Sequence, residues 1–131
     1  MAPTKAGFWY DKNDLVVDGV KLSEIAADHG TPLYVYSAEL LRRNYRRLVS
    51  FFPKIDLMVA YSTKANSNLA VLNVLAREGA GFDIVSGGEL ERVRRLGVPS
   101  NRVIFAGVGK TETEMRAALK AGVLEFNLES E

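Results

Sequence analysis

The sequence predicts an α/β fold built from repeated strand–helix units. From Asp56 onward, short apolar segments alternate with amphipathic segments of roughly ten residues, and glycines punctuate the repeats. Strands that alternate with helices in this way favour βαβ units and a parallel sheet. If the sheet curls into a TIM-type (β/α)8 barrel, right-handed crossovers place every helix on the same side. A doubly wound open sheet is the alternative, and periodicity alone does not separate the two.

Four strands are expected in this region, three of them followed by a complete helix. They lie at 57–62, 82–85, 103–106 and 124–127. Residues 66–68 supply N-cap candidates for the first helix. Ser86–Glu89 and Thr111–Glu114 have the spacing of a capping box, in which two side chains satisfy each other's backbone N–H groups. The helices should end at glycines, namely Gly79, Gly97 and Gly122.

The region before Ser37 has a different pattern. Strands are expected at 8–10 and 15–17, with Asp18-Gly19 as a hairpin turn. A short helix over 22–29 should follow, and then a strand at 33–36. Ser37 should cap a further helix whose apolar face carries Leu41, Tyr45, Leu48 and Phe52.

Four strands are too few to close a barrel. A (β/α)8 barrel needs eight strands and typically about 250 residues, whereas this chain has 131 residues. A half-barrel leaves two open edges, which are hazards for unwanted strand pairing. We therefore expect the chain to be the first half of a TIM-type barrel, preceded by a short N-terminal segment, within a longer enzyme.

The composition excludes several classes of protein. Seventeen basic and sixteen acidic side chains leave a net charge of +1, so no global field attracts nucleic acid or an anionic membrane. The absence of cysteine excludes disulfides and thiolate metal sites from this chain. No apolar run approaches membrane-spanning length. We expect a soluble, cytoplasmic protein with no metal site, no nucleic-acid partner and no membrane partner.

Lys64 is the first candidate for chemistry. Alternation along the first strand places Ser62 and Lys64 on the same face, with the lysine at the carboxyl end of the strand. Catalytic groups of barrels sit at that end, and a lysine nucleophile must be a free amine. Spacing alone favours a more ordinary interpretation, a solvated lysine in a βα loop, because lysines are mostly exposed.

Five ordered segments carry a resemblance to a known family. Tyr61-Ser62-Thr63-Lys64-Ala65-Asn66 resembles the Y-x-x-K-A-N motif of the pyridoxal-phosphate-dependent decarboxylases of alanine-racemase-like fold. The segment 81–90 is similar to the G-F-D-x-x-S-x-x-E segment of the same family. The remaining three matching segments are 30–36, 104–111 and 126–131. The resemblance covers nearly the whole chain, in the order and at the spacing of the family.

The resemblance implies roles for five residues. Lys64 would hold pyridoxal 5′-phosphate as a Schiff base and act in catalysis. Asp83 and Ser86 would lie next to the cofactor, with Glu89 and Asn66 behind them. Capping-box spacing also explains Ser86 and Glu89 without any cofactor.

The resemblance also implies a substrate and a domain arrangement. The stretches 86–90 and 106–111 lean toward the diaminopimelate branch of the family, which decarboxylates meso-2,6-diaminopimelate to L-lysine as a homodimer. Residues 1–36 would pack on a β domain absent from this chain, and 37–131 would form the N-terminal half of the cofactor-binding barrel. The phosphate-binding and substrate-binding residues would lie beyond position 131, so the chain alone should be inactive.

Two alternatives stay open. The first is a related decarboxylase of ornithine, arginine or carboxynorspermidine, and the second is a non-catalytic homologue that binds the cofactor. Gly109-Lys110-Thr111 resembles the end of a phosphate-binding P-loop, but Ile104 stands where the required first glycine would be. Lys110 is therefore expected to be an ordinary surface lysine before a helix. His29, at a helix end, is given no cofactor role.

Overall fold

The computed structural model describes residues 6–129, and the chain divides into two compact units, Met1–Leu48 and Val49–Glu131. Each unit is described by itself. The division falls within helix α2 (Ala38–Ser50), 12 residues after the expected boundary at 36/37. That expected boundary separates an N-terminal segment from a barrel half, and its assignment stays a prediction.

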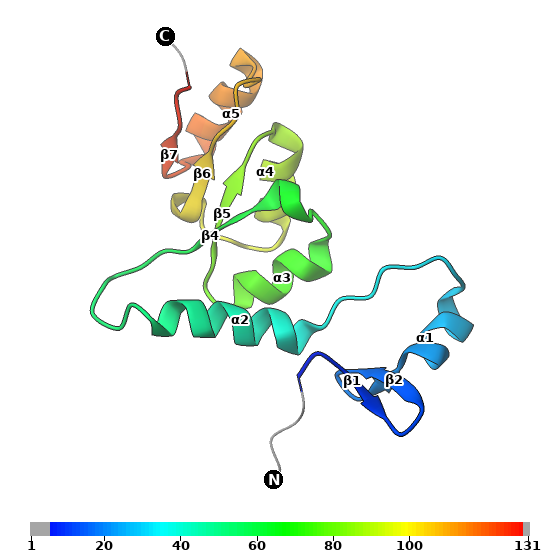
Figure 1. Cartoon of the computed structure of the whole chain (residues 1–131). Helices are drawn as coiled ribbons and strands as arrows, with labels where there is room; N and C mark the ends of the chain where they lie inside the picture. The colour runs from blue at the N-terminus through cyan, green and yellow to red at the C-terminus, as the bar shows by residue number, and fades with distance from the viewer. Residues whose placement is uncertain (1–5, 130–131) are drawn as a thin grey trace. The chain divides into compact units, whose positions relative to one another are not determined.

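The first unit opens with a small antiparallel sheet, β1 (Phe8–Asp11), β2 (Asp14–Val17) and β3 (Val20–Lys21), in that spatial order. Asp18 and Gly19 form the turn between β2 and β3 with φ values of 48° and 94°, as a two-residue hairpin turn requires. Helix α1 (Leu22–His29) follows as expected, and its last turn is closed by Gly30. The expected hairpin turn and helix are therefore confirmed (Figure 1).

The expected strand at 33–36 is wrong. This segment runs without regular secondary structure between α1 and α2, and it pairs with no strand among residues 6–129. Tyr34 is 91% exposed and Tyr36 is 54% exposed. An apolar, β-prone segment forms a strand only where a neighbouring strand satisfies its backbone groups, and the described part of the chain offers it none.

Asp18 ties the small sheet to the start of α2. Its carboxylate accepts hydrogen bonds from the Gly7 N–H at 2.9 Å, the Ser37 hydroxyl at 2.7 Å and the Glu39 N–H at 3.2 Å. Partial burial raises the pKa of Asp18, but these hydrogen bonds outweigh it and hold the pKa below its usual value. The Ser37 hydroxyl also accepts from the Leu40 N–H at 2.9 Å, so the expected cap is confirmed.

The second unit contains the expected parallel sheet. Its strands run in the sequential order β4 (Ala60–Ser62), β5 (Gly81–Ile84), β6 (Val103–Phe105) and β7 (Glu125–Phe126). The connecting helices are α3 (Leu69–Arg77), α4 (Gly87–Arg95) and α5 (Glu112–Ala121), with 3-10 turns η1 (Thr63–Ala65) and η2 (Ser100–Arg102). The first strand is shorter than expected because β4 lies at the sheet edge, where its ladder with β5 begins only at Ala60.

Register and burial show that the two faces of this sheet differ. The ladder aligns Tyr61 with Phe82 and Val103, and Phe82 and Val103 have no exposed surface. In the next row, toward the carboxyl ends of the strands, Ser62 aligns with Asp83, and both residues are only partly buried. The buried face packs on apolar residues of all three helices, namely Val71, Leu72, Leu75, Leu90, Val93 and Ala118.

One covered face and a sequential strand order favour the barrel arrangement. A doubly wound sheet carries helices on both faces and reverses its strand order at a switch point. Here the successive helices α3, α4 and α5 lie on one side of the sheet (Figure 1). They supply the core residues named above. The face that carries Ser62 and Asp83 corresponds to the inside of a barrel.

The helix starts agree with the expected caps, with one correction. Asn68 caps α3 by accepting from the Ala70 N–H at 2.8 Å. The Thr111–Glu114 capping box is complete. At α4 only half of the expected box forms: the Ser86 hydroxyl accepts from the Glu89 N–H at 3.3 Å, but the Glu89 carboxylate accepts from the Val85 N–H instead. That interaction holds the residue that directly follows β5.

Glu114 reaches beyond its own cap. Besides the N–H and hydroxyl of Thr111, its carboxylate accepts the N–H of Gly87, the first residue of α4, at 2.8 Å. The hydrogen bond from Gly87, followed by those from Thr111, lowers the pKa of Glu114 to about 2. A carboxyl whose pKa falls on folding stabilises the folded state only while it is ionised.

The stabilisation by Glu114 should therefore disappear in acid. At pH 6 the wild-type protein should have its unfolding midpoint at a higher denaturant concentration than the Glu114→Gln variant. This difference in midpoint should shrink as pH falls from about 4.5 to about 2. Denaturant unfolding at a series of pH values measures it. Glu112→Gln, which removes an exposed pair with Arg116, is the matched control. A Glu114→Gln difference that stays constant down to pH 2 would contradict the assignment.

Candidate functional site

Lys64 lies at the carboxyl end of β4, as expected, but not within the strand. The strand ends at Ser62, and Lys64 is the middle residue of the 3-10 turn η1. Strand alternation therefore does not extend to Lys64, and the expected shared face with Ser62 stays a prediction. The turn buries Thr63 completely and exposes Lys64, and it contacts β5. Lys64 is thus exposed in a turn that contacts the strand carrying Asp83.

Three buried oxygen atoms around this turn have no hydrogen-bond partner among residues 6–129. They are the hydroxyl oxygens of Ser62 and Thr63 and the Oδ1 atom of Asp83. A buried polar atom left unsatisfied costs about 1–3 kcal/mol, and such atoms in a folded protein call for a functional explanation. Ser62 and Asp83 are paired in the β4–β5 ladder, and Thr63 directly precedes Lys64. The three oxygens and Lys64 therefore belong to the carboxyl ends of two paired strands and the turn that follows the first of them.

Ser86, Glu89 and Asn66 have identifiable structural roles here. Ser86 caps α4 and Glu89 holds the Val85 N–H at 2.7 Å, so both shape the loop after β5. The Asn66 side chain accepts from the Asn68 N–H at 3.0 Å, which forms a tight turn between η1 and α3. Asn66 and Ser86 lie in the loops that follow β4 and β5, and Glu89 lies in the first turn of α4; each fixes the backbone there.

Lys110 is not the surface lysine that was expected. Only 8% of its side chain is exposed, and its amine pairs with the Glu129 carboxylate at 3.0 Å. The amine also donates to the Gly107 carbonyl and lies 6.0 Å from the centre of the Phe105 ring. The hydrogen bond from Lys110 is the main cause that lowers the pKa of Glu129. Local sequence did not reveal this arrangement, because Glu129 lies 19 residues further along.

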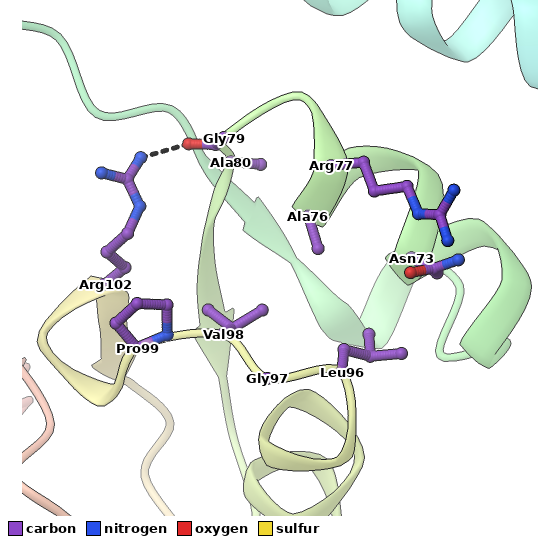
Figure 2. A pocket seen from close by; sticks show the side chains of 10 residues that line it. All are labelled: Asn73, Ala76, Arg77, Gly79, Ala80, Leu96, Gly97, Val98, Pro99 and Arg102. Carbon is purple, nitrogen blue, oxygen red and sulfur yellow. Dashed lines mark hydrogen bonds between the residues drawn. The ribbon is translucent and has the colours of Figure 1, made fainter.

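A pocket among the described residues lies away from Lys64. It has a volume of about 500 Å³ and is lined by the end of α3, the residues before β5 and the segment 96–99 that leads to β6. Figure 2 shows Arg102 on one side of this cavity, donating to the Gly79 carbonyl, and Arg77 on the other. The cavity therefore opens at the amino edge of the parallel sheet, whereas barrel enzymes place their chemistry at the carboxyl edge.

The residues around Lys64 fit a polar cofactor that carries a carbonyl group. An exposed lysine amine can attack a carbonyl, and the unsatisfied hydroxyl and carboxylate oxygens beside it can bind polar or cationic groups. Within residues 6–129, no three His, Cys, Asp or Glu side chains gather where they could hold a metal ion. The same part of the chain has no helix that is both long and apolar enough to cross a membrane.

Comparison with known proteins places the chain in a family. Residues 38–131 match the sequence profile of the pyridoxal binding domain of pyridoxal-dependent decarboxylases. Diaminopimelate decarboxylase of Pseudomonas fluorescens is 52% identical over 94% of this chain, and that of Aquifex aeolicus is 43% identical over 92%. The chain spans about 30% of the length of these relatives.

Solved structures agree with the sequence comparison. Diaminopimelate decarboxylase from M. jannaschii in complex with L-lysine matches with a TM-score of 0.90 at 37% identity, over 95% of this chain and 30% of that one. A lysine/ornithine decarboxylase from Vibrio vulnificus complexed with putrescine matches with a TM-score of 0.71 at 32% identity, over 82% of this chain and 30% of that one.

These comparisons confirm the expected fold class, an α/β chain that forms part of an alanine-racemase-like barrel. The sheet of four parallel strands accounts for half of the eight that such a barrel needs. The family profile begins one residue after Ser37, at the first residue of α2. The chain belongs to the pyridoxal-dependent decarboxylases.

Proposed function

We propose that this chain is the cofactor-anchoring part of a diaminopimelate decarboxylase, which converts meso-2,6-diaminopimelate to L-lysine with pyridoxal 5′-phosphate. The observation that carries the proposal is the exposed Lys64 at the carboxyl end of β4. Its chain neighbours Ser62 and Thr63, and Asp83 across the ladder from Ser62, hold buried oxygens with no partner among residues 6–129. Relatives named diaminopimelate decarboxylase at 41–52% identity support the choice of substrate.

The proposed roles follow from the position of each side chain. Lys64 binds the cofactor covalently through its amine and can return a proton to the substrate once carbon dioxide has left. The cofactor, when bound, supplies the electron sink that makes loss of carbon dioxide feasible. Asp83 offers a carboxylate oxygen to a polar or cationic group of the cofactor, and Ser62 and Thr63 offer hydroxyls. Ser86 contributes through the loop that it caps, with Glu89 and Asn66 behind it.

The rest of the proposed protein lies outside this chain. Residues 1–36 would pack on a β domain, and 37–131 would form the first half of the barrel. The phosphate-binding and substrate-binding residues would come from later segments, and the complete enzyme would be a cytoplasmic homodimer. This proposal accords with the 30% share of the relatives that the chain spans.

Lysine/ornithine decarboxylation is the second candidate. The Vibrio vulnificus structure supports it through a TM-score of 0.71 at 32% identity. Two structures of diaminopimelate decarboxylase from M. jannaschii match better, with TM-scores of 0.90 and 0.89 at 37% identity. The A. aeolicus protein AQ1208 matches with a TM-score of 0.88 at 42% identity. The higher identity and TM-scores of these structures favour diaminopimelate as the substrate.

Covalent labelling tests the anchor. After incubation of the full-length polypeptide with pyridoxal 5′-phosphate and borohydride reduction, peptide mass spectrometry should find the pyridoxyl group on Lys64. Lys64→Arg should lose it, because a guanidinium does not form the covalent bond. Lys120→Arg, in the exposed last turn of α5, should label as the wild type does. Equal labelling of Lys64→Arg at another lysine would refute the assignment.

Asp83 should bind the cofactor without stabilising the apoprotein. Its Oδ1 atom has no partner to lose, so Asp83→Asn should leave the unfolding free energy of the apoprotein unchanged or slightly higher. Loss of a charged hydrogen-bond partner costs about 1.5–3 kcal/mol, so the cofactor dissociation constant should rise about tenfold to a hundredfold. Absorbance titration and thermal unfolding measure the two quantities, with the exposed Asp56→Asn as control. A destabilised apoprotein with unchanged cofactor affinity would show a purely structural Asp83.

A substrate panel tests the reaction. The full-length polypeptide should release carbon dioxide from meso-2,6-diaminopimelate with a kcat/KM at least about a hundredfold above that for ornithine, arginine or lysine, because a site with polar groups for the second amino-acid centre rejects substrates that lack it. Residues 1–131 alone should release none. A preference for ornithine or lysine would favour the second candidate, and activity of the isolated chain would show that later segments are dispensable.

A further inference from the structure

The loop of Val85 and Ser86, which connects β5 to α4, and the first residue of α4, Gly87, are held by two carboxylates. Glu89, in the helix that the loop leads into, accepts the Val85 N–H at 2.7 Å. Glu114, which lies 27 residues beyond Gly87 in the next strand–helix unit, accepts the Gly87 N–H at 2.8 Å. The same loop contains Ser86 and follows the strand that carries Asp83. The backbone beside the proposed cofactor position is therefore fixed partly from another unit of the fold.

Glu114 is itself fixed. One carboxylate oxygen accepts the Gly87 N–H, while the other accepts the Thr111 N–H at 3.0 Å and the Thr111 hydroxyl at 2.7 Å. Both oxygens are thus engaged, and the low pKa keeps the group ionised at neutral pH. Both oxygens of Glu114 therefore bind residues of this chain, two of the donors being backbone N–H groups.

The glycine at position 87 is explained by this contact. Gly87 does not have a positive φ, so its backbone conformation alone does not require glycine. A Cβ atom placed there would lie 3.2 Å from Cγ and 3.5 Å from Oε1 of Glu114. A side chain at position 87 would therefore require the Glu114 side chain to shift by a few tenths of an ångström.

The same device recurs one unit later. Glu129, after β7, accepts the N–H of Gly107, after β6, at 2.7 Å, and Lys110 holds its second oxygen at 3.0 Å. In both cases a glutamate carboxylate of one strand–helix repeat accepts a glycine N–H from the segment that follows the strand of the preceding repeat. Both contacts lie at the carboxyl edge of the parallel sheet, the edge on which Lys64 is found.

We infer that Glu114 is a positioning residue for the cofactor site, which acts through the Gly87 N–H to hold the loop of Ser86 and the end of β5 in place beside Lys64. The inference rests on the proposed function. Glutamine at position 114 would retain one acceptor oxygen but turn an N–H₂ donor toward either Gly87 or Thr111, each of which already presents an N–H donor. Glu114→Gln should therefore loosen the loop while keeping the size of the side chain.

The test compares Glu114→Gln with Glu112→Gln in the full-length polypeptide. Glu112 lies in the same first turn of α5, but its carboxylate pairs with the exposed Arg116. Glu114→Gln should still label at Lys64 under saturating cofactor, with a cofactor dissociation constant raised about tenfold and altered visible circular dichroism of the bound cofactor. Glu112→Gln should match the wild type in all three. A purely stabilising role would lower the unfolding midpoint of Glu114→Gln but leave its cofactor affinity and visible spectrum unchanged, which would overturn the inference.

Gly87→Ala provides a second variant at the other end of the contact. It should raise the cofactor dissociation constant in the same direction, and combining it with Glu114→Gln should add little, because both changes disrupt one contact. Additive effects would overturn the inference, and Gly87→Ala decides alone if Glu114→Gln does not fold. Failure of the proposed function would look different from failure of this inference, because the wild-type protein itself would then carry no pyridoxyl label on Lys64.

Discussion

The pairing of β4 with β5 is the constraint on which the candidate site depends. Its parallel register sets Ser62 beside Asp83 on the face that the helices leave uncovered. The next residue, Thr63, begins the turn that presents Lys64 and contacts β5. A shift of this ladder by one residue would turn Asp83 into the apolar layer between the sheet and its helices and bring Phe82 to the open face. The register therefore decides which side chains meet the lysine.

The loops at the carboxyl edge are ordered by charge as well as by packing. Glu89, Glu114 and Glu129 each accept a backbone N–H from a residue that follows a strand, namely Val85, Gly87 and Gly107. Backbone groups in loops otherwise bond to water, so a carboxylate acceptor fixes a segment that would be more mobile. Groups that hold a cofactor need such support, because binding to a loose site costs the free energy of ordering it.

Much of the fold follows from local pattern, whereas the contacts between units do not. Alternation of apolar segments and caps predicted the parallel sheet and its three helices, and Asn68 and Thr111 cap as their spacing suggested. The strand at 33–36 failed because strand formation requires a partner that a local pattern does not reveal. The burial of Lys110 depends on Glu129, which is distant in sequence.

The candidate site shows the same division. The motif around Lys64 identified the residue, but the 3-10 turn that carries it was not expected from strand alternation. Ser62 and Thr63 lay within the motif without being singled out, because only the structure shows that their hydroxyls are buried without partners. Glu114 looked like an ordinary capping residue, since its bond to Gly87 joins separate units.

A crystal structure of the full-length polypeptide with pyridoxal 5′-phosphate would test the central claim most directly. The account predicts continuous electron density from the Lys64 amine to the cofactor, with Asp83 Oδ1 within hydrogen-bond distance, about 2.7–3.2 Å, of a cofactor or substrate atom. Density that joins the cofactor to another lysine, or an Asp83 carboxylate that still lacks a partner in the loaded site, would contradict it.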